Sequence, residues 1–272
     1  MPKYKFIDEG GKHIHTLGGE PLMGTSTILK EVYPPMLAWW AAELSAVECL
    51  EAGEHIPSIR EEYLAAVAKS GPDKKAAIDA LSKKYPVFKK ARFAHYDKMK
   101  GEGKKGTEAH KEVENYIRRC LEENVGVPLP ADGEVRQFAE WAQNDVSKFA
   151  FTEAHCYSEG LWVGGIIDFA YWDKELKFIV ADRKTSKDIY PTHFYQTSGY
   201  GIQFKENGAL TSEGEVILEP CKVDGYAIFQ QKGENEAQVM YRDDVAFLEQ
   251  IFRHTVDCYK DKKNIGFDIR NN

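Results

Sequence analysis

Two acidic residues and a lysine lie at the ends of two consecutive apolar runs in this chain. Gly165-Ile166-Ile167-Asp168 closes the run that begins at Leu161, and Asp182-Arg183-Lys184 closes the run that begins at Leu176. If the runs are strands of one hairpin, the two carboxylates can meet, and Lys184 shares a face with Asp182 because strand residues two apart do. Two carboxylates beside an ammonium suit a Mg²⁺ site for phosphodiester hydrolysis. The lysine can orient the attacking water or offset charge on phosphorus.

Further polar residues flank these motifs. His110 follows Gly106-Thr107-Glu108-Ala109 at the start of a predicted helix, with Glu114 one turn later, and Glu153 lies in the first predicted strand. A neutral imidazole is a competent ligand for Mn²⁺ and an acceptable one for Mg²⁺ beside carboxylates. Taken alone, His110 also fits a packed or surface histidine, and Glu114 fits a surface charge. Glu159 competes with Glu153 for the role of an additional acid.

Gln196 and Tyr200 lie four residues apart on a helix predicted after the lysine. Residues with this spacing are neighbours on one helix face. They fit either an ordinary amphipathic face or a pair that works together beside Lys184.

The ordered set of motifs resembles the PD-(D/E)XK nuclease superfamily, and within it the RecB-type exonuclease branch, which adds an upstream histidine and a QxxxY motif. The N-terminal region is similar to that of phage-encoded and mitochondrial exonucleases of this branch, as in Thr25-Ser26-Thr27-Ile28-Leu29 and Trp39-Trp40-Ala41-Ala42. The resemblance covers residues 4 to 242 approximately. It implies an α+β fold, with a restriction-endonuclease-like core of a mixed central sheet flanked by helices, preceded by an N-terminal helical region.

The resemblance also implies a role for each motif residue. Asp168 and Asp182 match the two metal carboxylates, and Lys184 matches the catalytic lysine. His110 matches the extra metal ligand, and Glu153 matches an acid that supports the metal site. Gln196 and Tyr200 match the pair that holds the lysine region and contacts DNA. The implied cofactor is Mg²⁺ or Mn²⁺.

Some members of this branch hold an iron–sulfur cluster with one upstream cysteine and three near the C-terminus. Here Cys258 is the only cysteine after Cys221, so no such cluster is expected. The five cysteines are scattered, which favours a reducing cytoplasm, here of a bacterial or phage-infected cell. No apolar run is long enough for a membrane span, and the N-terminus does not read as a secretory signal.

The pattern of the chain predicts helices first and strands later. The first predicted domain, residues 1–105, is an N-terminal hairpin and helical region and a candidate DNA arch; the second, residues 106–272, is the nuclease core. Gly101 to Gly106 reads as a flexible hinge between helices. The predicted helices are 25–33, starting under a Ser/Thr cap, then 36–44, 57–69, 73–83, 86–100, 106–123, 134–149, 191–206 and 243–263. The predicted strands are a hairpin within 3–24, then 153–157, 161–171, 176–185, 223–231 and 238–241.

Charge is distributed unevenly along the chain. The net charge of −7 argues against a general nucleic-acid coat protein. Residues 81–105 nevertheless carry eight lysines and one arginine with interleaved aromatics, which fits either a solvated helix or a surface that follows DNA phosphates. The candidate DNA contacts in this strip are Lys89, Lys90, Lys104 and Lys105.

Together these features predict a metal-dependent DNA exonuclease that acts on free ends in recombination, repair or phage DNA processing. Its expected partners are linear or single-stranded DNA ends and a recombination or single-strand-binding protein. The alternatives are an endonuclease or RNA-directed enzyme with the same core, and a non-catalytic DNA-binding subunit. A small-molecule enzyme is a further alternative, but the sequence contains no glycine-rich phosphate loop or nucleophile elbow that would support it.

Overall fold

A computed structural model describes residues 3–10, 12–34, 41, 44–45, 56–70, 74–123, 130, 134–186, 188–231 and 237–264. The chain divides into two compact units, Met1–Pro34 with Glu108–Asn272, and Pro35–Thr107. The first 34 residues therefore belong with the second predicted domain rather than with the first. The reason is strand pairing, because Met23 and Gly24 pair in parallel with Val163 and Gly164 of the central sheet.

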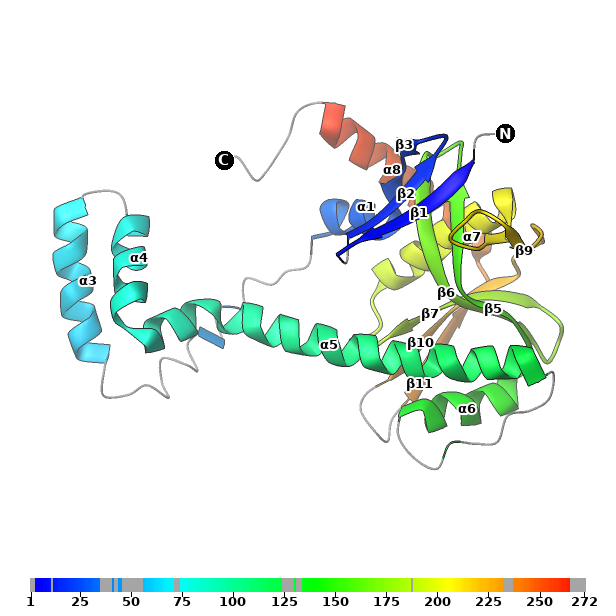
Figure 1. Cartoon of the computed structure of the whole chain (residues 1–272), viewed down its shortest axis with the longest axis horizontal. Coiled ribbons are helices and arrows are strands. Elements are labelled where there is room, and N and C mark those ends of the chain that lie inside the picture. Colours follow the sequence, from blue (N-terminus) through cyan, green and yellow to red (C-terminus); the bar gives the residue numbers. More distant parts are fainter. Residues whose placement is uncertain are drawn as a thin grey trace. The chain divides into compact units, whose positions relative to one another are not determined.

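The larger unit combines helices with a mixed central sheet, and the prediction of a mixed sheet flanked by helices is confirmed (Figure 1). The sheet has the order β11-β10-β7-β6-β5-β8-β9, and β4 pairs with β6 outside this path. The β7–β10 and β4–β6 pairs are parallel, and the other pairs of this sheet are antiparallel. The strands are β4 (Met23–Gly24), β5 (Val146–Ser158), β6 (Val163–Asp173), β7 (Phe178–Lys184), β8 (Ala209–Leu210), β9 (Val216–Leu218), β10 (Gly225–Gln231) and β11 (Ala237–Arg242).

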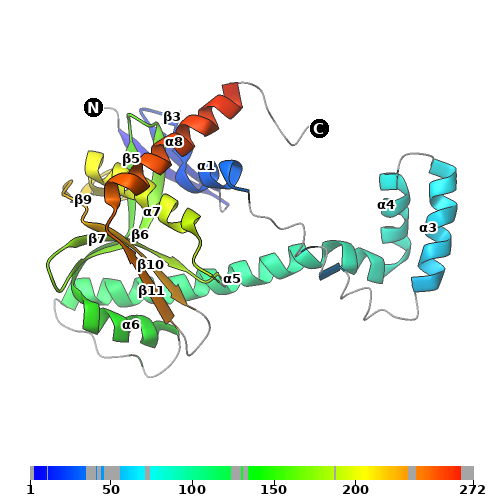
Figure 2. The same cartoon turned by 180° about the vertical axis from the view of Figure 1, so that it is seen from behind.

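Helices cover both faces of this sheet (Figure 2). On one face lie α1 (Thr25–Val32), α7 (Pro191–Asn207) and α8 (Val245–Asn264); on the other lie α6 (Glu134–Asp145) and the C-terminal part of α5 (Pro86–Glu123). Alternation along the strands supplies both cores. In β7, for example, Ile179 and Ala181 pack toward α6, whereas Phe178 and Val180 pack toward α7.

Several predicted boundaries are wrong in an informative way. The predicted helix 134–149 ends at Asp145, and residues 146–149 begin β5 instead. Val146 and Phe149 fit the helical spacing but pack into the same core from the strand. Helix α1 begins at Thr25 as predicted, yet its cap residue is Gly24, without a side-chain cap. Thr25 Oγ1 donates a hydrogen bond to the Gly164 carbonyl (3.2 Å) instead.

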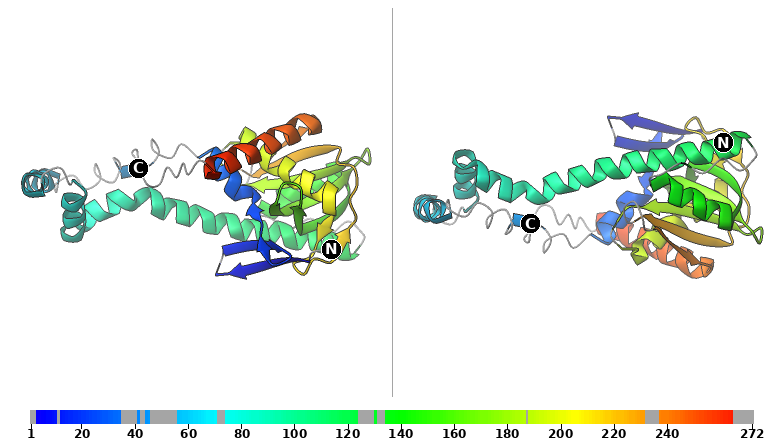
Figure 3. Two further views of the ribbon diagram at one scale, coloured as in Figure 1. Left: turned by 90° about the horizontal axis from the view of Figure 1, so that it is seen from above. Right: turned by 90° about the horizontal axis from the view of Figure 1, so that it is seen from below.

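The smaller unit contains α3 (Ile56–Ser70), α4 (Lys74–Lys84) and the first part of α5. Helix α5 is unbroken from Pro86 to Glu123, so the predicted hinge at 101–106 is wrong (Figure 3). Each glycine inside a helix costs only about 1 kcal/mol relative to alanine, and the lysines and glutamate between these glycines favour helix. Trp39 and Trp40 lie outside the described residues.

The N-terminal hairpin of β1 (Tyr4–Glu9) and β2 (Lys12–Leu17), joined by β3 (Glu20–Pro21), confirms the predicted one. It is anchored by the buried Tyr4 hydroxyl, which is hydrogen-bonded to Nδ1 of His15 (2.7 Å) and Nδ1 of His155 (3.1 Å). A hydroxyl has one proton, so at most one of these histidines can accept from it, and a ring that accepts must be neutral.

This anchor predicts acid sensitivity of the fold. Burial, with the neighbouring His155 and His13, lowers the pKa of His15 from 6.5 to about 4. Stability is complete above the unfolded-state pKa of 6.5 and falls as the pH drops toward 4. His15 contributes a loss of roughly 3 kcal/mol at most. Urea unfolding between pH 7.5 and 4.5 should show a shallower pH dependence for His15→Phe than for wild type. The exposed His254→Gln serves as control, and equal slopes in all three proteins would contradict the prediction.

Within the described residues, none of the helices combines the length and apolarity that crossing a bilayer requires.

Candidate metal and nuclease site

Neighbouring strands bring three predicted acids to one level of the sheet. Strands β6 and β7 are antiparallel with Phe169 opposite Ala181, so extending this register by one residue sets Asp168 opposite Asp182. On the other side, Thr152 pairs with Phe169 and Ala154 with Ile167, which sets Glu153 across from Asp168. The predicted hairpin is therefore present, and it brings Glu153 to the same level from β5.

A candidate metal-ligand group forms at this level from His110 of α5, Glu153 of β5 and Asp168 of β6. One ligand atom from each of these residues lies within 4.8 Å of the others. His110 Nδ1 is 3.6 Å from Asp168 Oδ2. Asp182, predicted as a ligand, does not belong to this group; its Oδ2 lies 2.7 Å from Lys184 Nζ. Glu153, predicted as a supporting acid, belongs to the group in its place.

The other acids considered from the sequence are elsewhere. Glu114 forms an ion pair with Arg118 one turn away on α5 (2.7 Å). Glu159 is exposed in the turn after β5.

The backbone is irregular where Glu153 and Asp168 lie. Phe151 and Ala154 pack into the same core, as do Ile167 and Ala170, although residues three apart on a regular strand face opposite sides. Both strands therefore change phase at the two acids. Glu153 has a φ of +49°, a left-handed conformation that costs a residue with a Cβ about 1–3 kcal/mol. Strain of this kind is concentrated at functional sites.

Asp168 is held from two sides. The Arg183 backbone N–H donates to Asp168 Oδ2 (2.8 Å), and Thr152 Oγ1 donates to the Asp168 carbonyl (2.9 Å). These bonds fix the carboxylate between β5 and β7 without consuming its second oxygen.

Lys184 is held by a chain of side chains from α7. Its Nζ donates to Gln196 Oε1 (2.9 Å), and Gln196 Nε2 donates to the Tyr200 hydroxyl (2.8 Å). With the Asp182 ion pair, this chain fixes the ammonium in position. Gln196 and Tyr200 thus lie where the sequence predicts a pair that holds the lysine region. Their contact with DNA stays a prediction.

Glycines of the Gly-Gly-Ile-Ile-Asp motif make room for the supporting residues. A Cβ on Gly165 would lie 2.5 Å from Tyr200 Cε1 and 3.1 Å from Thr25 Oγ1. A Cβ on Gly164 would lie 2.7 Å from that of His15. The first glycine therefore admits the N-terminal hairpin, and the second admits the ring that supports Gln196.

Replacing Gly165 by alanine should displace the Tyr200 ring and loosen the chain to Lys184. We expect a loss of stability of about 1–3 kcal/mol, because the added Cβ would overlap the Tyr200 ring and the surrounding core leaves little room for the ring or the backbone to move. Any activity that depends on the position of Lys184 should fall more than the folded fraction does. The control is Gly160→Ala, where an added Cβ would be 4.0 Å from its nearest neighbour. Equal melting temperatures of the two variants would show that the ring moves freely.

Burial governs the protonation of the site. Burial, followed by the charges of Asp168 and Glu114, raises the pKa of Glu153 to about 8. Burial likewise raises the pKa of Asp182 to about 7, against the lowering effect of Lys184, and raises the pKa of Asp168. Burial and the Arg183 charge lower the pKa of His110 to about 4, which leaves a neutral imidazole able to coordinate. A bound divalent cation would favour the ionised carboxylates.

Arg183 is a residue that sequence reasoning missed. Its side chain is 1% exposed, and its Nη2 donates to Gln231 Oε1 (2.8 Å), whose Nε2 donates to Gln137 Oε1 (3.4 Å). Its charge contributes to the lowered pKa of His110 and partly offsets the rise that burial causes in the pKa of Asp168. The available signal was its place inside an apolar strand, where an arginine must have buried polar partners.

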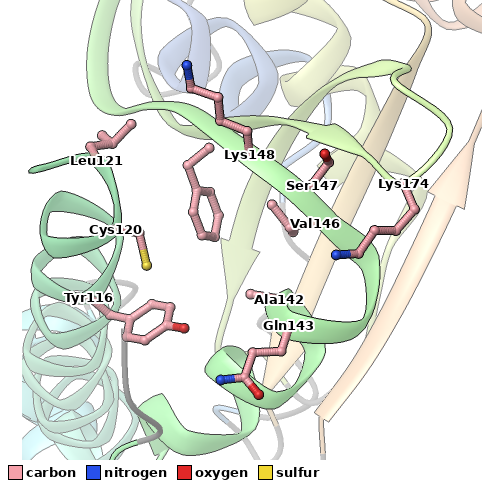
Figure 4. Close-up of a pocket in the computed structure, with 10 residues that line it drawn as sticks. Tyr116, Cys120, Leu121, Ala142, Gln143, Val146, Ser147, Lys148 and Lys174 are labelled. Atoms are coloured by element: carbon pink, nitrogen blue, oxygen red, sulfur yellow. The ribbon is translucent and has the colours of Figure 1, made fainter. Parts of the chain in front are cut away.

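A pocket of about 440 Å³ lies apart from the predicted site, between the C-terminal ends of α5 and α6 and the start of β5 (Figure 4). Tyr116, Cys120 and Gln143 line it, with Lys148 and Lys174. Among the described residues, Cys120, Cys156, Cys221 and Cys258 form no disulfide, and Cys49 lies outside the described residues. The expectation that the chain holds no iron–sulfur cluster stays a prediction.

The lysines predicted to contact DNA lie on α5, within the smaller unit. Lys89 and Lys90 are exposed, and the side chains of Lys104 and Lys105 lie outside the described part of the helix. No family model matches the chain, and no curated protein matches it. Its function must therefore be argued from the geometry of the site.

Proposed function

We propose that this chain is a metal-dependent DNA nuclease with a restriction-endonuclease-like core that hydrolyses phosphodiester bonds from free ends. The observation that supports this most is the joint placement of His110, Glu153 and Asp168 as a ligand group, with Lys184 anchored at the neighbouring strand. One level of the sheet thus combines an imidazole, carboxylates from three neighbouring strands and an ammonium held by two partners, which are the groups that a metal-dependent hydrolase uses.

The donor set fits Mg²⁺ or Mn²⁺. Carboxylate oxygens of Glu153 and Asp168 are the hard ligands that both ions prefer, and the His110 imidazole suits Mn²⁺ in particular. Asp182 supplies a further carboxylate at the same level, and it is close enough for Asp168 and His110 to affect its protonation electrostatically. A bound ion would supply Lewis-acid stabilisation of charge on the phosphate.

The chain's own residues supply position and proton control. Lys184 stands beside Asp182 with its ammonium held by Gln196, so it can donate hydrogen bonds to a phosphate oxygen or to the attacking water. The charges of Asp182 and Asp168 outweigh burial and raise the pKa of Lys184, which favours the protonated form for this role over a general base. Thr152 and the Arg183 backbone keep Asp168 oriented while substrate enters.

The test compares end-labelled linear DNA with closed circular DNA in Mg²⁺, Mn²⁺ and EDTA. Release of mononucleotides or short products from linear DNA alone, abolished by EDTA, supports the proposal. Cutting of circular DNA would favour the endonuclease alternative. DNA binding without cutting under all metal conditions would favour a non-catalytic DNA-binding subunit, and full activity in EDTA would contradict the metal mechanism. Pull-down from infected or recombining cells would reveal a recombination or single-strand-binding partner.

Neutralising exposed lysines of α5 tests the DNA path. Changing Lys89 and Lys90 to glutamine should raise the KM for DNA and reduce the slope of log affinity against log salt by roughly 0.7 to 0.9 for each phosphate that the protein no longer neutralises. Turnover at saturating DNA should be unchanged, because such lysines hold ground and transition states alike. Lys148→Gln, an exposed lysine on β5, is the matched control. An unchanged salt slope would assign Lys89 and Lys90 to solvent.

A further inference from the structure

A second, smaller pocket lies on the same face of the sheet as Lys184 and has no part in the site described above. It has a volume of about 140 Å³ and is formed where the N-terminal ends of α7 and α8 meet β11. Its floor is made by the buried Phe194 and Leu248. Its rim carries large side chains that are unusually exposed: Tyr190 (48%), Met240 (38%) and Phe247 (56%).

The guanidinium of Arg242, a planar cation, also lines the pocket. The Arg242 guanidinium donates from Nε to Asp244 Oδ1 (2.8 Å) and from Nη2 to the other oxygen of the same carboxylate. Its central carbon lies 5.9 Å from the centre of the Phe194 ring. A bidentate pair keeps the guanidinium plane rigid. Aromatic rings and a guanidinium plane around one small opening are the surfaces on which a planar heterocycle stacks.

The pocket lies close to the candidate metal site. Met240 of the pocket pairs with Ile228, which pairs with Asp182, so two strand spacings, about 10 Å, separate the pocket from the level of Asp182 in the sheet. Along α7, Pro191 precedes Gln196 by five residues, a rise of about 7.5 Å. Stacked DNA advances about 3.4 Å per nucleotide along one strand, so a base within about three nucleotides of the cut phosphate could reach the pocket.

We propose that this pocket binds one unpaired nucleobase of the DNA strand that is being hydrolysed. The inference rests on the proposed function and specifies its substrate, since a base can enter only where the strand is single. A duplex keeps its bases stacked inside, and the rings around the pocket would then contact only the backbone. Stacking without base-specific hydrogen bonds also implies little sequence preference.

The experiment measures binding of single-stranded oligonucleotides by fluorescence anisotropy in Ca²⁺, which can replace the catalytic ion without supporting turnover. Phe247→Ala should weaken binding about 5- to 100-fold, and Phe247→Trp should restore it. Phe247→Leu, which keeps the apolar contact but loses the ring, should resemble alanine. Val216→Ala, an equally exposed apolar residue on β9, should bind as wild type does.

A set of oligonucleotides with one abasic position identifies the base that stacks. Removal of the base at one position near the end should weaken binding to the wild-type protein. The same removal should not weaken binding to Phe247→Ala any further. Additive losses at every position would overturn the proposal. So would a change of oligomeric state in Phe247→Ala by light scattering, because the pocket would then be covered by a second copy. Ring-dependent binding without hydrolysis in Mg²⁺ or Mn²⁺ would refute the proposed nuclease and retain the pocket; hydrolysis with ring-independent binding would do the reverse.

Discussion

Replacing Asp168 by asparagine should reduce DNA hydrolysis by roughly 10³-fold while the protein stays folded. The asparagine oxygen can still accept the Arg183 N–H, so the link between β6 and β7 survives. What disappears is the negative charge between His110 and Glu153, on which binding of a divalent cation depends. We therefore expect Mn²⁺ affinity, measured by calorimetry, to fall together with turnover.

The matched control is Asp173→Asn, at the far end of the same strand. Asp173 accepts backbone N–H groups from Glu175 (2.8 Å) and Lys177 (2.9 Å) in the turn to β7, and asparagine can do the same. Wild-type activity in this control would show that the loss at Asp168 is specific to its position. Wild-type Mn²⁺ affinity in Asp168→Asn would mean that the cluster is an acidic group without a metal function.

Replacing Lys184 by methionine should lower turnover by about 10²- to 10³-fold with little change in DNA binding. Its ammonium would act on charge that develops in the transition state, so its removal should affect kcat rather than affinity. Arginine should not restore turnover, because a planar fork cannot replace a compact ammonium between Asp182 and Gln196. Lys177→Met, an exposed lysine paired with Glu175, is the control.

The two quantities must be measured separately, turnover in Mg²⁺ and DNA binding in Ca²⁺. A parallel fall in both would make Lys184 an anchoring residue for DNA. Methionine also leaves the buried Asp182 without its ion pair, so unfolding in urea should be recorded for each variant.

Much of the larger unit could be predicted because its strands are long and rich in apolar residues. The hairpin that carries Asp168 and Asp182 follows from two apolar runs separated by a turn, and α7 follows from Pro191 at its first position. The errors lie where one pattern satisfies two structures. Val146 and Phe149 fit both a helix face and a strand face, and the decision depends on the core that they share with Phe169.

The site could be predicted in its residues and only partly in its grouping. Chain order indicates that His110, Asp168, Asp182 and Lys184 belong together, but not which acid faces the imidazole. That choice is made by a change of strand phase at Glu153 and by the ion pair that turns Asp182 toward Lys184. Neither is written in a local pattern, because both depend on contacts between residues distant along the chain.

The left-handed backbone of Glu153 has a consequence for how this protein can change over generations. Glycine or asparagine would relieve the strain at this position. Substitution by either residue would therefore stabilise the fold and would be retained unless selection for activity opposed it. If the proposed function is correct, a descendant that lost it should acquire glycine or asparagine at position 153 early. The residue at this position in each related lineage would then indicate whether that lineage has kept the reaction.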